Sequence, residues 1–331
     1  MRSRRCIFVL ANTMIAGLML TGAILGATGA RAQPAPGWPL KPVRIIVPYA
    51  PGGSTDNGVR PVMERLSTAL GQQFVIENRG GASGAVGTEA GVRSAPDGYT
   101  FFVVPVATAT VLPAARKMPY DSFKDMVPVS KVFENTLVFA IHPSIPAATM
   151  EEFAAYARQN PGKLVFGSSG LGTLTQMVCE SARFAGKFEM LHVPYRGGGE
   201  ALADFLAGHV QVHCEGNVLP HVKAGKARLL AVADNERHPD FPDVRTLKEI
   251  WPDADAMSWA GLFAPVGTPD AIVRRLSADL IKVARDPGLK EQMQRLAVRP
   301  AASTPEELAA SLRKDFERYG KLVRALNIRM D

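Results

Sequence analysis

Three times along this chain, an apolar strand runs into a turn of small residues, and a helix pattern begins directly afterwards. The three turns span residues 48–56, 167–173 and 194–199. Such alternation of strands and helices is typical of an α/β fold, and it predicts sheets whose strands are mostly parallel. In open α/β sheets, turns of this kind lie at the carboxyl ends of the strands, where ligands bind.

The first turn predicts an anion-binding site. Val43–Val47 reads as a short buried strand, and Pro48 ends it because proline has no N–H to pair in a sheet. Ser54, Thr55 and Asp56 are all residues that cap a helix start, here a helix through Leu70. A strand, a glycine turn and a helix start together point free backbone N–H groups and the positive end of a helix dipole at one spot. Because one such turn lies in the first segment and two lie in the middle segment, we expect a cleft between two domains with anion donors on both walls.

The N-terminus predicts export. Arg2, Arg4 and Arg5 precede a mostly apolar stretch over residues 6–28, and Ala30-Arg31-Ala32 supplies a cleavage site. This pattern predicts a secretory signal peptide over residues 1–32, cleaved after Ala32, and hence a periplasmic protein. An uncleaved membrane anchor is the alternative, and the choice between the Sec and twin-arginine routes stays open. No later segment has about 18 consecutive apolar residues, so we expect a soluble mature chain.

Net charge and cysteine content indicate which classes of function are compatible with this chain. Removing the leader removes four arginines and no acids, so the formal charge falls from +7 to +3. That value is too mild and too scattered to indicate nucleic-acid binding. Cys179 and Cys214 remain in the mature chain. An exported protein can oxidise them, but the sequence leaves a disulfide and two buried thiols equally open.

The sequence contains no well-matched motif for catalysis or metal binding. Ser168 and Ser169 lie between Gly167 and Gly170, but neither has glycine two positions away on both sides, as a nucleophile elbow requires. A secreted hydrolase using one of these serines is therefore an unfavoured alternative to a binding turn. His209, His213 and Cys214 follow no recognised ligand spacing, so we expect no metal site and no cofactor.

Seven short motifs occur in order along the chain from about Trp38 to the end. They lie at residues 48–56 with Arg60, 75–81, 97–100, 167–173, 193–197, 223–226 and 258–265. Together they resemble the Bug-type (tripartite tricarboxylate transporter) extracytoplasmic solute-binding proteins. The resemblance implies a two-domain periplasmic binding protein of type II, a Venus flytrap with its ligand cleft between the lobes. It places lobe 1 at residues 38–136 and 230–331, and lobe 2 at residues 137–229.

The resemblance also implies a function. Such a protein is not an enzyme: it captures a small organic carboxylate and delivers it to the membrane permease subunits of a tripartite tricarboxylate-type transporter. We expect a monomer. A sensing subunit that signals to a membrane partner after binding the same ligand is the alternative, which the sequence does not separate from transport.

In this family, backbone amides, hydroxyls and bridging waters hold the ligand carboxylate. The expected ligand-binding residues are Tyr49, Ala50, Gly52, Gly53, Ser54, Asp56, Ser168, Ser169, Gly172, Thr173, Tyr195, Gly197, Gly198 and Asp204. Three departures leave the ligand's identity open. Glu200 stands where the family usually has proline, Gln176 where histidine is common, and the segment over residues 212–221 is about two residues short.

Overall fold

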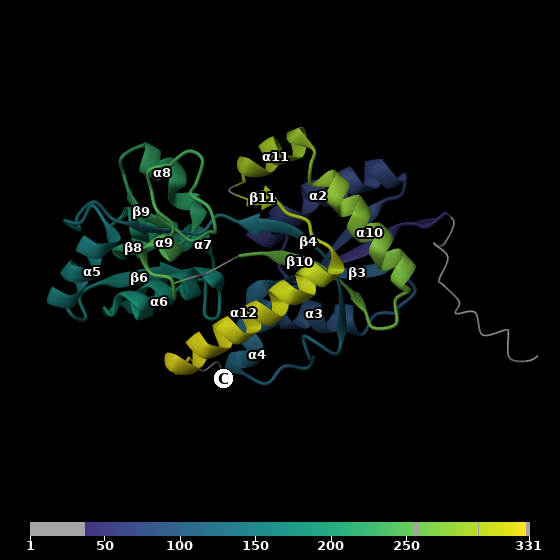
Figure 1. Ribbon diagram of the computed structural model, residues 1–331, viewed down its shortest axis with the longest axis horizontal. Coiled ribbons are helices and arrows are strands. Elements are labelled where there is room, and N and C mark those ends of the chain that lie inside the picture. Colours follow the sequence, from purple (N-terminus) through teal and green to yellow (C-terminus); the bar gives the residue numbers. More distant parts are fainter. Residues whose placement is uncertain (1–36, 255–257, 297, 329–331) are drawn as a thin grey trace, which may run out of the picture. The chain divides into compact units, whose positions relative to one another are not determined.

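The computed structural model of this chain describes residues 37–254, 258–296 and 298–328. The predicted signal peptide and its cleavage site lie outside this part of the chain. The described residues form two sheets with helices packed on them (Figure 1). Within the same residues, no helix is both long and apolar enough to cross a membrane.

The first sheet has six strands in the order β11-β4-β10-β3-β1-β2. These strands are β1 (Val43–Val47), β2 (Phe74–Asn78), β3 (Thr100–Pro105), β4 (Met126–Asn135), β10 (Ala260–Pro265) and β11 (Val298–Pro300). The second sheet has five strands in the order β7-β6-β8-β5-β9. They are β5 (Val138–Ile141), β6 (Val165–Ser168), β7 (Leu191–Pro194), β8 (Val212–His213) and β9 (Arg228–Val232).

Both sheets are mixed, which corrects the prediction of mostly parallel strands. In the first sheet, β1 runs parallel to β2 and β3, but β10 is antiparallel to both β3 and β4, and β11 is antiparallel to β4. In the second sheet, β6 is parallel to β7 and β8, whereas β5 is antiparallel to β8 and β9. A helix between two strands fixes the direction of successive strands in one sheet. It does not fix the direction of β10, which rejoins the first sheet after the whole second sheet has been built.

Helices fill the connections between strands. They are α2 (Ser54–Leu70), α3 (Ala85–Val92), α4 (Leu112–Ala115), α5 (Met150–Gln159), α6 (Leu174–Gly186), α7 (Gly198–Leu206), α8 (Leu219–Lys223), α9 (Leu247–Ile250), α10 (Asp270–Val283), α11 (Pro287–Gln294) and α12 (Pro305–Ala325). Three short helical turns complete the set: η1 (Ala82–Gly84), η2 (Ala107–Val111) and η3 (Gly216–Val218).

The first sheet is buried on both faces. Successive strand residues point to opposite sides, so Ile45 packs with α2 and α10 in one core, while Ile46 packs with α12 in another. Figure 1 shows the long helix α12 running past β10. Burial on both faces explains why β1 and β3 are almost continuously apolar rather than alternating.

The chain passes from the first sheet to the second between Asn135 and Val138. It returns later than the expected boundary near residue 230. Strand β9 pairs with β5, and Leu247 and Ala254 lie in the core of the second sheet. Residues 228–254 therefore belong with the second sheet. The sequence of an apolar strand such as β9 is compatible with either sheet. Only the strand with which it pairs decides the sheet to which it belongs.

Candidate functional site

A cavity of about 480 Å³ lies where segments of both sheets approach each other. Most of the residues around it come from the three glycine turns and from the crossing between the sheets, and others lie near Ala107, Glu215 and Val298. Gly53, Thr173 and Gly197, which are the N-cap residues of α2, α6 and α7, all line this cavity. Three helices thus begin at one hollow.

None of these three N-caps accepts a side-chain hydrogen bond from a backbone N–H of its own helix within the described residues. Side-chain caps occur elsewhere in the chain, although α3, α4, α8 and α10 lack them as well. Thr149, Asp286 and Thr304 each accept hydrogen bonds from first-turn N–H groups of α5, α11 and α12, and all three lie outside the cavity. Uncapped N–H groups and the positive ends of helix dipoles attract anions. Their convergence makes the cavity suited to a small anion.

Asp56 holds the first turn in place. Its carboxylate, 1% exposed, accepts hydrogen bonds from the Gly52 N–H at 2.9 Å and from Asn78 Nδ2 at 2.9 Å. Arg60 donates two more, from Nε at 2.7 Å and from Nη2 at 2.9 Å. Burial opposes ionisation, but the Arg60 guanidinium and the other donors hold the pKa of Asp56 below its usual range. Asp56 therefore shapes the turn instead of capping the helix or lining the cavity.

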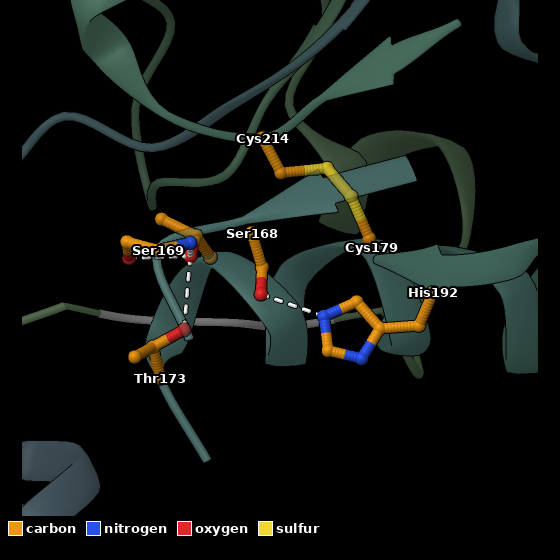
Figure 2. The surroundings of a disulfide bond; sticks show 7 residues. Ser168, Ser169, Thr173, Cys179, His192 and Cys214 are labelled. Carbon is orange, nitrogen blue, oxygen red and sulfur yellow. Dashed lines mark hydrogen bonds between the residues drawn. A yellow bond between two sulfur atoms is a disulfide. The ribbon is translucent and has the colours of Figure 1, made fainter. Parts of the chain in front are cut away.

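The second turn presents hydroxyl groups. Thr175 Oγ1 lies 2.8 Å from Ser169 Oγ and 3.0 Å from Thr173 Oγ1, and all three residues line the cavity. Ser168, by contrast, is fully buried and lies outside it. Figure 2 shows the Ser168 hydroxyl directed at the ring of His192, whose Nε2 is 2.6 Å away. Burial lowers the pKa of His192 to about 4, so this imidazole is neutral at physiological pH.

The third turn exposes backbone and one cation. Gly197 and Gly198 line the cavity together with Arg196, whose exposed guanidinium forms no ion pair with any described residue. Tyr195 lies outside the cavity because its hydroxyl donates to Asp204 Oδ2 at 2.7 Å. Burial, together with that carboxylate, raises the pKa of Tyr195 to about 12.

A further segment lines the cavity and carries an acidic side chain. Glu215, Gly216 and Asn217 line the cavity just after β8. The Glu215 Oε2 atom is buried and has no hydrogen-bond partner among the described residues. Burial raises the pKa of Glu215 to about 7. Arg196 is the other side chain with a full charge among the residues that line the cavity.

The structure gathers eight of the fourteen predicted residues around the cavity. They are Tyr49, Gly52, Gly53, Ser54, Ser169, Thr173, Gly197 and Gly198. The other six do not line it: Ala50, Asp56, Ser168, Gly172, Tyr195 and Asp204. Several of these six, such as Asp56 and Ser168, instead hold a turn in shape through internal hydrogen bonds.

The cavity has further lining residues outside the expected ligand-binding set. They include Thr55, Asn57, Asn135, Thr136, Thr175, Arg196, Glu215 and Asn217. Thr175 and Asn57 sit within a turn of predicted helix starts, so that pattern could have indicated them. Asn135 and Thr136 sit at the crossing between sheets, for which the chain carries no local signal.

His209, His213 and the two cysteines of the predicted mature chain have structural partners. Cys179 and Cys214 form a disulfide, which answers the question left open above. His213 Nε2 lies 2.7 Å from Asn217 Oδ1, and His209 Nδ1 lies 3.4 Å from Asp204 Oδ1. Among the described residues, no group of three histidine, cysteine or acidic side chains could hold a metal ion.

Substituting Glu215 with glutamine should stabilise the protein at pH 8 by about 3 kcal/mol. The raised pKa means that the folded state holds a proton that the unfolded state has already released, so the native protein loses stability as the pH rises from about 4.5 to about 7. Below pH 4.5 both states are protonated, and the difference should vanish. Urea unfolding of the native protein and of Glu215→Gln at pH 4.5 and pH 8 measures this difference in stability. An equal difference at the two pH values would contradict the raised pKa.

Comparison with protein families and curated sequences reveals clear relatives. Residues 59–328 match the family described as tripartite tricarboxylate transporter family receptor. The chain is 32% identical over 311 residues to "UPF0065 protein in tcbD-tcbE intergenic region" of Pseudomonas sp. (strain P51), covering 92% of this chain and 93% of that protein. It is 31% identical over 314 residues to protein BugT of Bordetella pertussis, covering 91% and 96% respectively.

Solved structures show the same architecture. The periplasmic binding protein BugD aligns with a TM-score of 0.75 at 28% identity, over 89% of this chain and all of BugD. Rpa4515 of R. palustris with adipate aligns with a TM-score of 0.76 at 28% identity, covering 87% and 97%. MatC of Rhodopseudomonas palustris with bound malate aligns with a TM-score of 0.73 at 29% identity, covering 86% and 100%. The fold is therefore that of a two-lobe periplasmic binding protein, as the sequence predicts.

Proposed function

This chain belongs to the family of tripartite tricarboxylate transporter receptors, and from that premise we propose that it captures a small organic carboxylate in the periplasm and delivers it to membrane permease subunits. The observation that supports this most directly is the convergence of three uncapped helix starts on one cavity. Two similar proteins were solved with adipate and with malate, both carboxylates. The ligand carboxylate would be held by N–H groups of the first and third turns and by the hydroxyl groups of the second.

The proposal also covers the compartment in which the protein acts and the closure of its cavity on the ligand. The Cys179–Cys214 disulfide supports an oxidising compartment such as the periplasm, reached by the predicted signal peptide. The proposed lobes follow the two sheets, residues 37–135 with 258–328, and residues 138–254. Hinge motion between the two lobes would close the cavity on its ligand. The protein would act as a monomer.

A thermal-shift screen of mono-, di- and tricarboxylates tests the proposal on protein purified from the periplasm. A ligand present at 100 times its Kd should stabilise the protein by about 2.7 kcal/mol. The uncharged amide of each active ligand is the matched control and should lose most of the effect. If no carboxylate stabilises the protein at millimolar concentration, the proposal fails.

Replacing Gly197 with leucine should block the cavity and weaken carboxylate binding at least tenfold, or about 1.4 kcal/mol. Gly197 lines the cavity, its φ of −176° suits any residue, and a Cβ atom there would meet nothing within 4 Å. The fold should therefore tolerate the side chain. Ala203→Leu, on an exposed position of the same helix outside the cavity, is the matched control. Calorimetric titration gives the affinities, and equal binding by both variants would place the ligand elsewhere.

We propose further that the protein is not an enzyme. Ser168 and His192 are in hydrogen-bond contact, but the serine is fully buried and lies outside the cavity, which leaves it out of reach of a substrate there. Labelling of Ser168 by a fluorophosphonate would revive the hydrolase alternative. A sensing role with the same ligand is also compatible with this site, and crosslinking to permease or to kinase subunits in membranes would separate the two.

A further inference from the structure

The Glu215 carboxyl group is the one feature of the cavity that carboxylate binding leaves unexplained. It lines a cavity whose three helix starts attract negative charge, yet it is itself acidic. Its Oε2 atom is buried without a hydrogen-bond partner among the described residues. A buried acceptor left unpaired destabilises a protein by roughly 1–3 kcal/mol, more if it is charged, so such groups usually meet a ligand or a water molecule.

The surrounding residues hold the carboxyl group in place without pairing with it. A Cβ atom on Gly198 would come within 1.9 Å of Glu215 Oε2, so glycine there lets the carboxyl group lie against the start of α7. Asn217 donates from Nδ2 to the Gly198 carbonyl at 3.2 Å and accepts at Oδ1 from His213 Nε2 at 2.7 Å. The Asn217 amide and His213 Nε2 are therefore occupied by one another and by Gly198, whereas His213 Nδ1 is buried without a hydrogen-bond partner among the described residues. Cys214, immediately before Glu215, is anchored by the disulfide.

The electrostatic environment of Glu215 favours binding of a cation. Burial lowers the pKa of His213 to about 4, so this neighbour is neutral. Arg196 is exposed, and its guanidinium forms no ion pair with Glu215 or any other described residue. An ionised Glu215 thus lacks a counter-charge from the described part of the chain. A second ligand carboxylate placed beside it would be repelled, and a hydroxyl group would supply a hydrogen bond without a compensating charge.

We propose that Glu215 is a specificity-determining residue that accepts a hydrogen bond from an ammonium group of the ligand. The preferred ligand is then a small carboxylate that also carries an amine, with its carboxylate at the helix starts and its amine at Glu215. This role rests on the carboxylate binding proposed above. This role explains why a destabilising buried carboxyl group is present, because binding the ammonium group supplies the hydrogen-bond partner that Glu215 lacks.

The test compares carboxylates with their amino derivatives: butyrate with 4-aminobutyrate, succinate with aspartate, and glutarate with glutamate. In at least one pair, the amino compound should bind the native protein about tenfold tighter, as expected for a hydrogen bond to a charged group. In Glu215→Gln this advantage should fall below about threefold, since the amide carries no charge. Glu236→Gln removes the same charge at an exposed position outside the cavity and should leave the advantage intact.

A second measurement needs no variant. In native protein with ¹³C-labelled glutamate, the Glu215 carboxyl resonance at pH 7 should move toward the ionised position on adding the amino compound and not on adding its parent. If parent carboxylates bind but no amino compound is preferred, or if the preference survives in Glu215→Gln, the role of Glu215 is wrong and the proposed function stands. If no member of any pair binds and the wider carboxylate screen is also negative, both fail together.

Discussion

Replacing Asp56 with alanine is expected to lower the free energy of unfolding by about 2–4 kcal/mol and to weaken ligand binding at least tenfold. The substitution removes a carboxylate that is 1% exposed and leaves the Gly52 N–H, Asn78 and Arg60 without their acceptor. Arg60 is 44% exposed and can turn to water, so the loss stays below that of a fully buried pair. Binding suffers because Gly52, Gly53 and Ser54, which line the cavity, are no longer held in one conformation.

Asp270→Ala is the matched control for this prediction. Asp270 also lies in the first turn of a helix and pairs with an arginine four residues on, Arg274, at 2.8 Å. Its side chain is 69% exposed, so its loss should lower stability by no more than about 1 kcal/mol and leave ligand affinity unchanged. Chemical denaturation and calorimetry give both quantities. Equal losses in the two variants would show that burial of Asp56 has no special role.

The same carboxylate predicts a dependence on pH. Because the pKa of Asp56 is lower in the folded protein, its contribution is fully present above the unfolded value near 3.8 and is lost as the pH falls through the folded value. The native protein should therefore lose stability more steeply below pH 4 than Asp56→Ala does. Parallel curves for the two proteins in this range would contradict the lowered pKa.

Removing the disulfide by the double substitution Cys179→Ala and Cys214→Ala should lower the free energy of unfolding by about 3–4 kcal/mol. The bond joins residues 35 apart, and it links α6, which starts at the cavity, to the segment that presents Glu215. Cutting it increases the freedom of the unfolded chain and loosens one wall of the cavity. Denaturant unfolding measures the first effect, and ligand titration measures the second.

A reductant provides the control for the disulfide. Both sulfur-bearing residues are fully buried, so a reductant should act on the native protein only once it unfolds. Under reducing conditions the native protein should unfold at the same denaturant concentration as the double variant, which should itself be insensitive to the reductant. If the native protein unfolds identically with and without reductant, the bond does not contribute to its stability.

Local patterns predicted much of the helix and strand content but not every role. Thr149 caps α5 as the sequence indicates, because a cap involves residues three positions apart. At α2 the prediction was wrong: Gly53 is the N-cap, and Asp56 turns back to the Gly52 N–H. Asn78, 22 residues away, and Arg60 fix Asp56 in that arrangement, and contacts of this kind leave no local trace in the sequence.

The family resemblance is confirmed by the match over residues 59–328, and it extends to the fold. The boundary between the sheets was less predictable. The crossing at residues 136–137 follows the end of the ten-residue strand β4, whereas the return after Ala254 depends on β9 pairing with β5. Strand pairing between residues some 90 positions apart is decided by packing, not by the composition of either strand.

The sequence by itself determined three helix starts after glycine turns, because the residues that form such a turn are neighbours in the chain. Only the tertiary structure decided that Gly53, Thr173 and Gly197 meet at one cavity and that Cys179 and Cys214 are bonded. It alone decided, too, that Glu215 Oε2 lies there without a hydrogen-bond partner among the described residues. Whether a polar group is paired depends on every atom around it, and those atoms come from distant parts of the chain. The turns therefore indicate an anion from sequence alone, the family resemblance implies that it is a carboxylate, and the amine that we propose beside it emerges only from the folded cavity.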